Sequence, residues 1–109
     1  MYVYDEANNL AKAIQESREY KEFKKAKEEM ANNPEIKTKI DDFEKIRHDV
    51  QVMSFQGKDD PEKMKKLQEM YNILNADKQI KEYFDMEVRF NIMLADVNKI
   101  ISESVKDIL

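Results

Sequence analysis

The last thirty or so residues of the chain, from Asp77 to Leu109, contain neither glycine nor proline. Apolar side chains recur through this segment at steps of three and four, which is the spacing of one face of an α-helix. The pattern predicts one continuous helix from about Lys78 to Asp107. Such a helix would be about 45 Å long, whereas a compact domain of this chain length is roughly 35 Å across. The upstream segments are therefore expected to be shorter helices that cover part of it.

Apolar residues continue to both ends of this long predicted helix. In a heptad count from Tyr83, two neighbouring seams are apolar, which makes a stripe wider than a two-stranded coil needs. Because the helix exceeds its own domain and stays apolar at its ends, we expect a homo-oligomer, with a dimer as the favoured state. The candidate interface residues are Phe90, Leu94, Val97, Ile101, Val105 and Ile108.

The middle of the long helix also carries apolar residues on a third side, at Val88, Ile92 and Ala95. This arrangement predicts that the middle section is nearly surrounded by protein. Asn91 and Asn98 lie one heptad apart in the same section. A buried asparagine can fix the register and the number of helices in a bundle. An asparagine at the solvent-exposed edge of the apolar stripe has no such role. The sequence leaves both readings open.

Glycine occurs once and proline twice in the 109 residues. Strands and tight turns need more of both, so the chain is predicted to be all-α. We expect a bundle of about five helices with a helical hairpin and one long C-terminal helix, forming a single domain over residues 1–109. The four upstream helices are predicted at residues 4–16, 18–31, 34–55 and 61–75.

The helix boundaries rest on capping residues. Ser17, Asn33, Asp60 and Asp77 are predicted N-caps, two of them followed by proline at the first helical position. Gly57 is predicted to follow the end of the third helix with positive φ. Inward positions of the second helix are Tyr20, Phe23, Ala26 and Met30. Those of the third helix are Ile36, Ile40, Phe43, Ile46 or Arg47, Val50 and Met53. Those of the fourth are Met64, Leu67, Met70, Tyr71 and Leu74.

Residues that could carry chemistry are scarce. There is no cysteine, and His48 is the one histidine. Carboxylate-bridged metal sites in helical bundles use a Glu-x-x-His pattern on two helices, and residue 45 is lysine. Acidic pairs such as Asp41-Asp42 point about 100° apart on a helix and do not converge. We therefore predict no catalytic, cofactor-binding or metal-binding residue, no cofactor and no enzymatic activity.

Charged residues make up 39% of the chain, and the net charge is −4. Lysines cluster modestly in residues 21–27 and 58–66, but glutamates interleave them, which favours pairing within helices. A nucleic-acid partner is therefore not expected, because phosphate binding needs uncompensated positive charge. The start of the chain has neither the basic nor the apolar part of a signal peptide, and its longest apolar run is far too short to span a membrane. We expect a cytoplasmic protein that does not insert into membranes.

The first residues follow the pattern Tyr-Asp-x-Ala-Asn-x-Leu over residues 4–10, and Glu-Ser-x-Glu-Tyr-Lys over residues 16–21. This opening, with the Asn-Pro boundary at Asn33 and the Gln-Gly turn at Gln56, resembles the YlbF/YmcA/YheA family of small helical bacterial proteins, and most closely its YheA-like branch. The resemblance covers nearly the whole chain. It implies a helical protein without enzymatic activity that often self-associates. Some family members hold iron–sulfur clusters through cysteines, which this chain lacks.

The resemblance also implies a role as an adaptor in the regulation of competence, sporulation or biofilm development. The alternative is an accessory protein in RNA processing that works with a ribonuclease, since family members work with the enzyme that matures messenger RNA. An adaptor needs exposed anchors, and aromatic residues are frequent ones. The candidate partner surface is Tyr2, Tyr4 and Tyr20, and a core position is the other reading for Tyr20.

Overall fold

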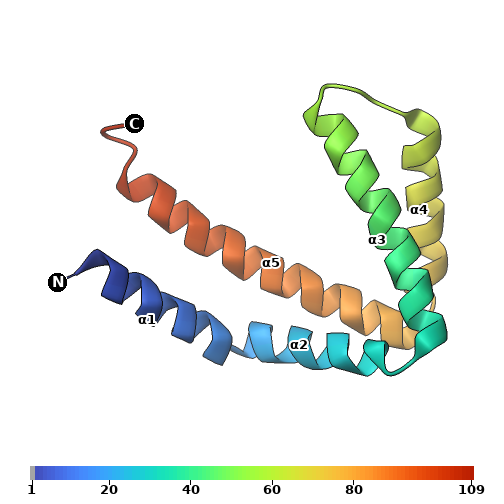
Figure 1. Ribbon diagram of the computed structural model, residues 1–109, viewed down its shortest axis with the longest axis horizontal. Coiled ribbons are helices and arrows are strands. Elements are labelled where there is room, and N and C mark those ends of the chain that lie inside the picture. The colour runs from blue at the N-terminus through green and yellow to red at the C-terminus, as the bar shows by residue number, and fades with distance from the viewer. Residues whose placement is uncertain (1) are drawn as a thin grey trace. The chain divides into compact units, whose positions relative to one another are not determined.

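A computed structural model describes residues 2–109. The described chain forms five α-helices and no strand (Figure 1), which confirms the all-α prediction. The helices are α1 (Val3–Glu16), α2 (Arg18–Ala31), α3 (Pro34–Phe55), α4 (Pro61–Asn75) and α5 (Lys78–Ser104).

The predicted capping residues hold the helix starts. The side chain of Asn33 accepts a hydrogen bond from the backbone amide of Ile36 at 3.3 Å. Asp60 accepts from the amides two and three positions further on, both at 3.1 Å, and Asp77 does the same at 2.9 and 3.1 Å. Gly57 has a φ of 74°, in the left-handed region that glycine adopts without a steric cost. Local sequence therefore sets where these helices begin and where α3 ends.

The prediction for the end of the last helix was wrong by three residues, since α5 ends at Ser104 and not at Asp107. The Ser104 hydroxyl donates to the carbonyl of Ile101 at 2.6 Å. Beyond it, the amide of Val105 bonds to Ser102, three residues back, at 3.3 Å. Serine side chains compete in this way with the backbone bonds of a helix. The first helix begins at Val3, one residue before the predicted start.

The chain divides into two compact units. The central unit is Glu28–Glu82, and the terminal unit combines the N-terminal residues up to Lys27 with Tyr83–Leu109. The single domain predicted over residues 1–109 stays a prediction.

In the central unit, α3 and α4 lie side by side as an antiparallel hairpin, as predicted (Figure 1). The buried residues of this unit are Met30, Ile40, Phe43, Leu74 and Ile80. The inward positions predicted for α3 are buried or half-buried. The prediction for Met64 on α4 was wrong, because Met64 is 51% exposed. Tyr71 is partly exposed, but its ring packs on Phe43 of α3 with centroids 6.2 Å apart. The apolar stripe of α4 is wider than its contact with α3, so the edges of the stripe remain uncovered.

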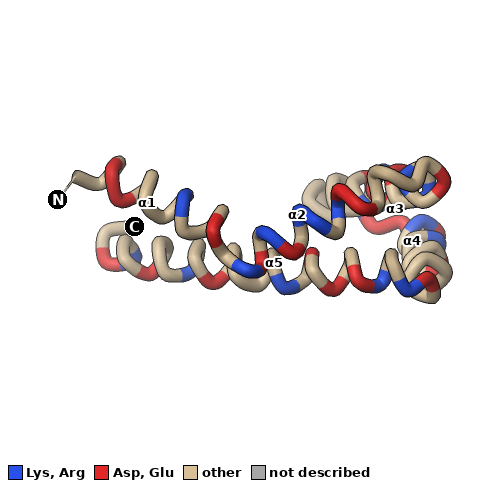
Figure 2. The backbone as a smooth tube through the Cα atoms, turned by 90° about the horizontal axis from the view of Figure 1, so that it is seen from below, with Lys and Arg blue, Asp and Glu red and all other residues tan. Residues whose placement is uncertain are grey.

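In the terminal unit, α1 and the first part of α2 follow one another along α5 (Figures 1 and 2). The N-terminus and the C-terminus lie at the same end of this unit. Figure 2 shows basic and acidic residues mixed along α5, whereas α1 is mainly acidic and the first part of α2 is mainly basic. The buried residues of this unit are Tyr83 and Phe84 on α5.

Candidate interaction surface

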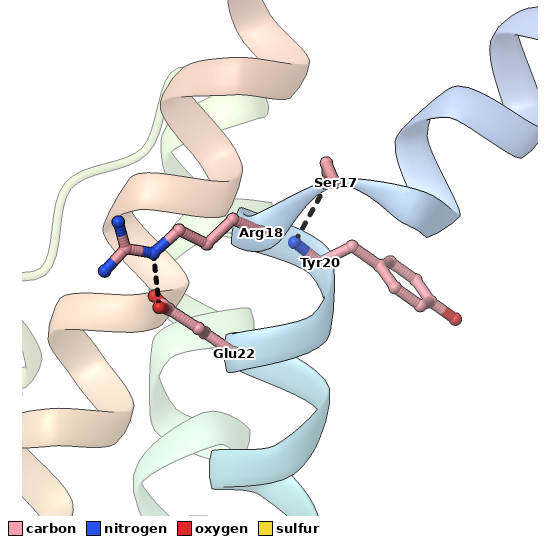
Figure 3. Close-up of polar contacts among 4 residues, drawn as sticks. All are labelled: Ser17, Arg18, Tyr20 and Glu22. Atoms are coloured by element: carbon pink, nitrogen blue, oxygen red, sulfur yellow. Dashed lines mark hydrogen bonds and ion pairs between the residues drawn. The ribbon is translucent and has the colours of Figure 1, made fainter.

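Ser17 lies at the junction between α1 and α2, and its side chain bonds to the backbone of both helices (Figure 3). Its hydroxyl donates to the carbonyl of Ile14 at 2.6 Å and accepts from the amide of Tyr20 at 3.1 Å. A hydroxyl can do both because it has one donor and two acceptor sites. The predicted cap is therefore confirmed, and it places Tyr20 in the first turn of α2.

One turn of α2 is held by an exposed ion pair between Arg18 and Glu22, at 2.6 Å. The hydrogen bond and the negative charge of Glu22 raise the pKa of Arg18 above its ordinary value. Figure 3 shows this pair on one side of α2 and the Tyr20 ring pointing to the other side. The side of α2 that carries the Tyr20 ring is therefore free of this ion pair and available for apolar contacts.

Tyr20 and Phe23 pack against α5 through their rings. The ring centroid of Phe90 lies 6.2 Å from that of Tyr20 and 5.6 Å from that of Phe23. Phe23 also lies 5.5 Å from the ring of Tyr83. These are ordinary distances for packed aromatic pairs. Tyr20, a candidate partner residue, is half-buried and helps to pack α2 on α5.

An open groove of about 280 Å³ runs beside these rings, and we call it the lysine–aromatic groove. It is lined by Tyr20, Phe23, Lys24, Lys27 and Phe90. The ammonium of Lys27 lies 5.8 Å from the centre of the Phe23 ring. In the described chain, no carboxylate forms an ion pair with either lysine. The groove therefore offers aromatic surface next to two lysines that form no ion pair within the described chain.

The sequence predicted that Lys24 and Lys27 pair with glutamates of their own helix, and it did not predict this groove. Their spacing from Phe23, one and four positions along a helix, was visible. The contribution of Phe90 was not, because it comes from the distant end of the chain.

Exposed apolar side chains lie on more than one side of α5. Val88, Ile92 and Ala95 are exposed, so the prediction that protein surrounds this section is wrong for the single chain. The reason is that α2 packs on α5 through Tyr20 and Phe23 at Phe90, which lies on another side of the helix. Ile100 is 70% exposed and Ile101 is 51% exposed. Large apolar side chains in one region of a helix are unusual on a monomer and mark a contact surface.

The candidate interface residues fall into two groups. Phe90, Leu94, Val97 and Val105 are half-buried, whereas Ile101 and Ile108 are exposed. Asn91 and Asn98 are both exposed in the single chain. These two polar side chains therefore separate the side of α5 that carries Leu94 and Ile101 from the side that carries Val88 and Ala95.

The two remaining candidates, Tyr2 and Tyr4, lie at the start of α1. They are 61% and 68% exposed, and their rings meet edge to face with centroids 5.4 Å apart. The adjacent Asp5 and Glu6 are also exposed. This end of the chain thus presents two aromatic rings and two carboxylates together.

The structure shows neither a metal site nor a membrane-spanning helix in the residues that it describes. His48 is exposed on α3. Across residues 2–109, no three histidine, aspartate or glutamate side chains gather closely enough to hold a metal ion. Within the same range, no helix has both the length and the hydrophobicity needed to cross a membrane.

These observations define a small all-α protein whose prominent surface features are apolar and aromatic. The profile of a family described as "Control of competence regulator ComK, YlbF/YmcA" matches residues 3–106. The chain belongs to this family, as the sequence resemblance predicted.

Among curated relatives, the chain is 39% identical over 104 residues to a UPF0342 protein of Symbiobacterium thermophilum, covering 94% of this chain and 93% of the relative. It is 36% identical over 104 residues to a UPF0342 protein of Caldicellulosiruptor saccharolyticus, covering 94% and 87%. A solved protein of unknown function (DUF964) from Bacillus stearothermophilus has the same fold, with a TM-score of 0.82 at 16% identity, covering 96% and 93% of the two chains.

A further solved structure with this fold is Bacillus subtilis RicA in complex with RicF. The TM-score is 0.62 at 21% identity, over 96% of this chain and 94% of the matched chain. At this identity the likeness concerns the fold.

Proposed function

We propose that this protein is a non-enzymatic adaptor that binds protein partners in the regulation of competence, sporulation or biofilm development. The observation that carries the proposal is an open, partly apolar hollow on α5 in which Ile92 and Ile100 are exposed. Exposing such side chains to water costs free energy, which a partner helix recovers by covering them. The family description, which names control of competence, supports the regulatory part.

The solved complex of RicA with RicF also supports a binding role. It is a protein of the same fold in contact with another protein. An arrangement of five helices with uncovered apolar stripes suits this use, because a helix from a partner can complete a bundle that the single chain leaves open.

We further propose that the protein forms a homodimer through α5, with the two helices antiparallel. Four candidate interface residues are arranged symmetrically about the point between Val97 and Asn98. A two-fold axis there would place Phe90 level with Val105 of the second copy, and Leu94 level with Ile101 of the second copy. Every apolar residue of this set then lies level with another apolar residue, as a self-complementary two-fold interface requires.

Light scattering tests the dimer, since a monomer has a mass of 13.0 kDa. We expect twice this mass at micromolar concentration. A stable monomer over this concentration range contradicts the dimer.

Affinity purification with chemical cross-linking from the source cell tests the adaptor role. The wild type is compared with a Tyr2→Ala/Tyr4→Ala variant of unchanged melting temperature, and reduced partner recovery by the variant is expected. Equal recovery would remove the two tyrosines from the partner surface.

A second candidate function is that of an RNA-processing accessory protein that works with a ribonuclease. The specific observation in its favour is the lysine–aromatic groove, because single-stranded nucleic acid stacks its bases on rings and places phosphates on lysines. The net charge of −4 weighs against it. A salt titration of RNA binding separates the two: tight, steeply salt-dependent binding without any recovered protein partner favours the second candidate.

A further inference from the structure

We propose that the first residues of one copy, Tyr2 to Glu6, bind in the lysine–aromatic groove of a second copy, and that the two copies make this contact reciprocally. This proposal rests on the antiparallel dimer proposed above. We call residues 2–6 the N-terminal segment.

The two surfaces are complementary in chemistry. The N-terminal segment presents the exposed rings of Tyr2 and Tyr4. It also presents the carboxylates of Asp5 and Glu6, for which the described chain provides no ion pair. The groove presents aromatic rings and two lysines, for which residues 2–109 likewise provide no ion pair. The two surfaces thus carry opposite charges, and both offer aromatic rings for packing.

The N-terminal segment cannot reach the groove of its own chain. Tyr4 precedes Tyr20 by sixteen positions, which is about 24 Å along a helix at 1.5 Å per residue. Ser17 interrupts the helix, but Figure 1 shows α2 continuing onward from α1 without folding back. Only a second copy can therefore bring the segment to the groove.

The antiparallel dimer brings the N-terminal segment of one copy to the same position along the α5 axis as the groove of the other copy. Tyr20 lies beside Phe90, and α1 runs from there along α5 towards the C-terminus (Figure 1). Tyr4, sixteen positions before Tyr20, is therefore level with a point just beyond Ser104, where α5 ends. In the proposed register, Val105 of the second copy is level with Phe90. The N-terminal segment of the second copy thus lies level with the groove.

The surface area that the reciprocal contact would bury is large compared with a standard interface. An aromatic side chain buries about 150–250 Å², so four tyrosines from two copies would contribute on the order of 600–1,000 Å² when fully buried. A standard stable interface buries about 1,600 Å² in total. The reciprocal contact would thus supply a large share of the dimer interface in addition to α5.

A charge exchange tests the contact. In Lys24→Glu/Lys27→Glu, two positive charges of the groove are reversed, and in Asp5→Lys/Glu6→Lys the two carboxylates are replaced. Each double variant should raise the dissociation constant of the dimer by at least about tenfold, because four exposed ion pairs of modest strength are lost. The chain that combines all four substitutions should regain most of the wild-type affinity.

The matched control is Lys21→Glu/Lys25→Glu. It has the same change in net charge on the same helix, at two exposed lysines that do not line the groove. Sedimentation equilibrium gives the dissociation constants, and circular dichroism checks that each variant is folded. We expect the control to stay within about threefold of the wild type, since isolated surface charges contribute little.

The outcomes separate this inference from the dimer itself. If the wild type is a dimer but the combined variant does not recover, or the control weakens the dimer equally, the reciprocal contact is refuted and the α5 dimer stands. If the wild type is a monomer, the α5 dimer and the reciprocal contact are both refuted.

A disulfide gives a second measurement, because the chain has no cysteine. Asp5→Cys chains and Lys24→Cys chains, mixed and oxidised, should form a mixed disulfide. Asp5→Cys mixed with Lys65→Cys, an exposed position on α4, should not. Equal yields from the two mixtures would overturn the proposal.

Discussion

The Ser17 hydroxyl accepts a hydrogen bond from the amide of Tyr20 at 3.1 Å, and this bond fixes where α2 starts. From this first turn the Tyr20 ring extends to Phe90 on α5, with the ring centroids 6.2 Å apart. A helix cap thus positions one wall of the lysine–aromatic groove. Stability and surface shape are linked at this junction.

Substitution of Ser17 by alanine should lower the free energy of unfolding by about 1 kcal/mol, because the amide of Tyr20 loses its acceptor. Ser17→Asp keeps an acceptor for the Tyr20 amide but cannot donate to the Ile14 carbonyl, so its stability should lie between those of Ser17→Ala and the wild type. Urea unfolding followed by circular dichroism measures both. Equal stability of Ser17→Ala and the wild type would show that the cap contributes nothing.

The helix boundaries could be predicted because their causes are local. Asn33, Asp60 and Asp77 each bond to amides within three residues, and such contacts are encoded by neighbouring positions in the sequence. The error at the end of α5 has the same origin. Ser104 competes for the carbonyl of Ile101, an effect that the absence of glycine and proline does not reveal.

Gly57 provides a test of backbone strain without a steric clash. Its φ is 74°, and a Cβ added there would have no neighbour within 4 Å. Gly57→Ala should therefore destabilise the protein by about 1–2 kcal/mol through its left-handed conformation alone. Gly57→Asn should cost less, because asparagine tolerates this region better. Urea unfolding of the three proteins should rank them Gly, Asn, Ala, and any other order would contradict the strain argument.

Exposure was harder to predict than helix position. Met64 follows the apolar period of α4 and Val88 adds an apolar side to α5, yet both are exposed. Periodicity shows that a face is apolar and does not show whether the same chain covers it. The lysine–aromatic groove was missed for a related reason, since Phe90 joins it through a contact between distant parts of the sequence.

Two phenylalanines of α3 should differ greatly in how much their substitution by alanine lowers the stability. Phe43 is 3% exposed and Phe55 is 94% exposed. Phe43→Ala should lower the free energy of unfolding by about 3–5 kcal/mol, because it leaves a cavity in the core of the central unit. Phe55→Ala serves as the matched control and should change it by less than about 0.5 kcal/mol. Thermal or urea unfolding distinguishes the two. A large loss for Phe55→Ala would mean that something covers this residue in solution.

The proposed α5 interface can be probed with one exposed isoleucine from each unit. Ile101 is 51% exposed on α5 and belongs to the candidate interface, whereas Ile73 is 74% exposed on α4 and does not. Covering an aliphatic side chain of this size contributes about 1.5–3 kcal/mol, and a two-fold dimer covers it in both copies. Ile101→Asp should therefore raise the dissociation constant of the dimer about 100-fold or more.

Ile73→Asp makes the same chemical change outside the proposed interface, so it should leave the dissociation constant within about threefold of the wild type. Sedimentation equilibrium measures both constants. Circular dichroism should show that both variants keep their helices, because each isoleucine is exposed within its own chain. Leu94→Asp should additionally weaken folding, since Leu94 is half-buried against its own chain. A dimer of undiminished affinity in Ile101→Asp would place the contact elsewhere than the C-terminal half of α5, and equal weakening by Ile73→Asp would show that the effect is not specific to this helix.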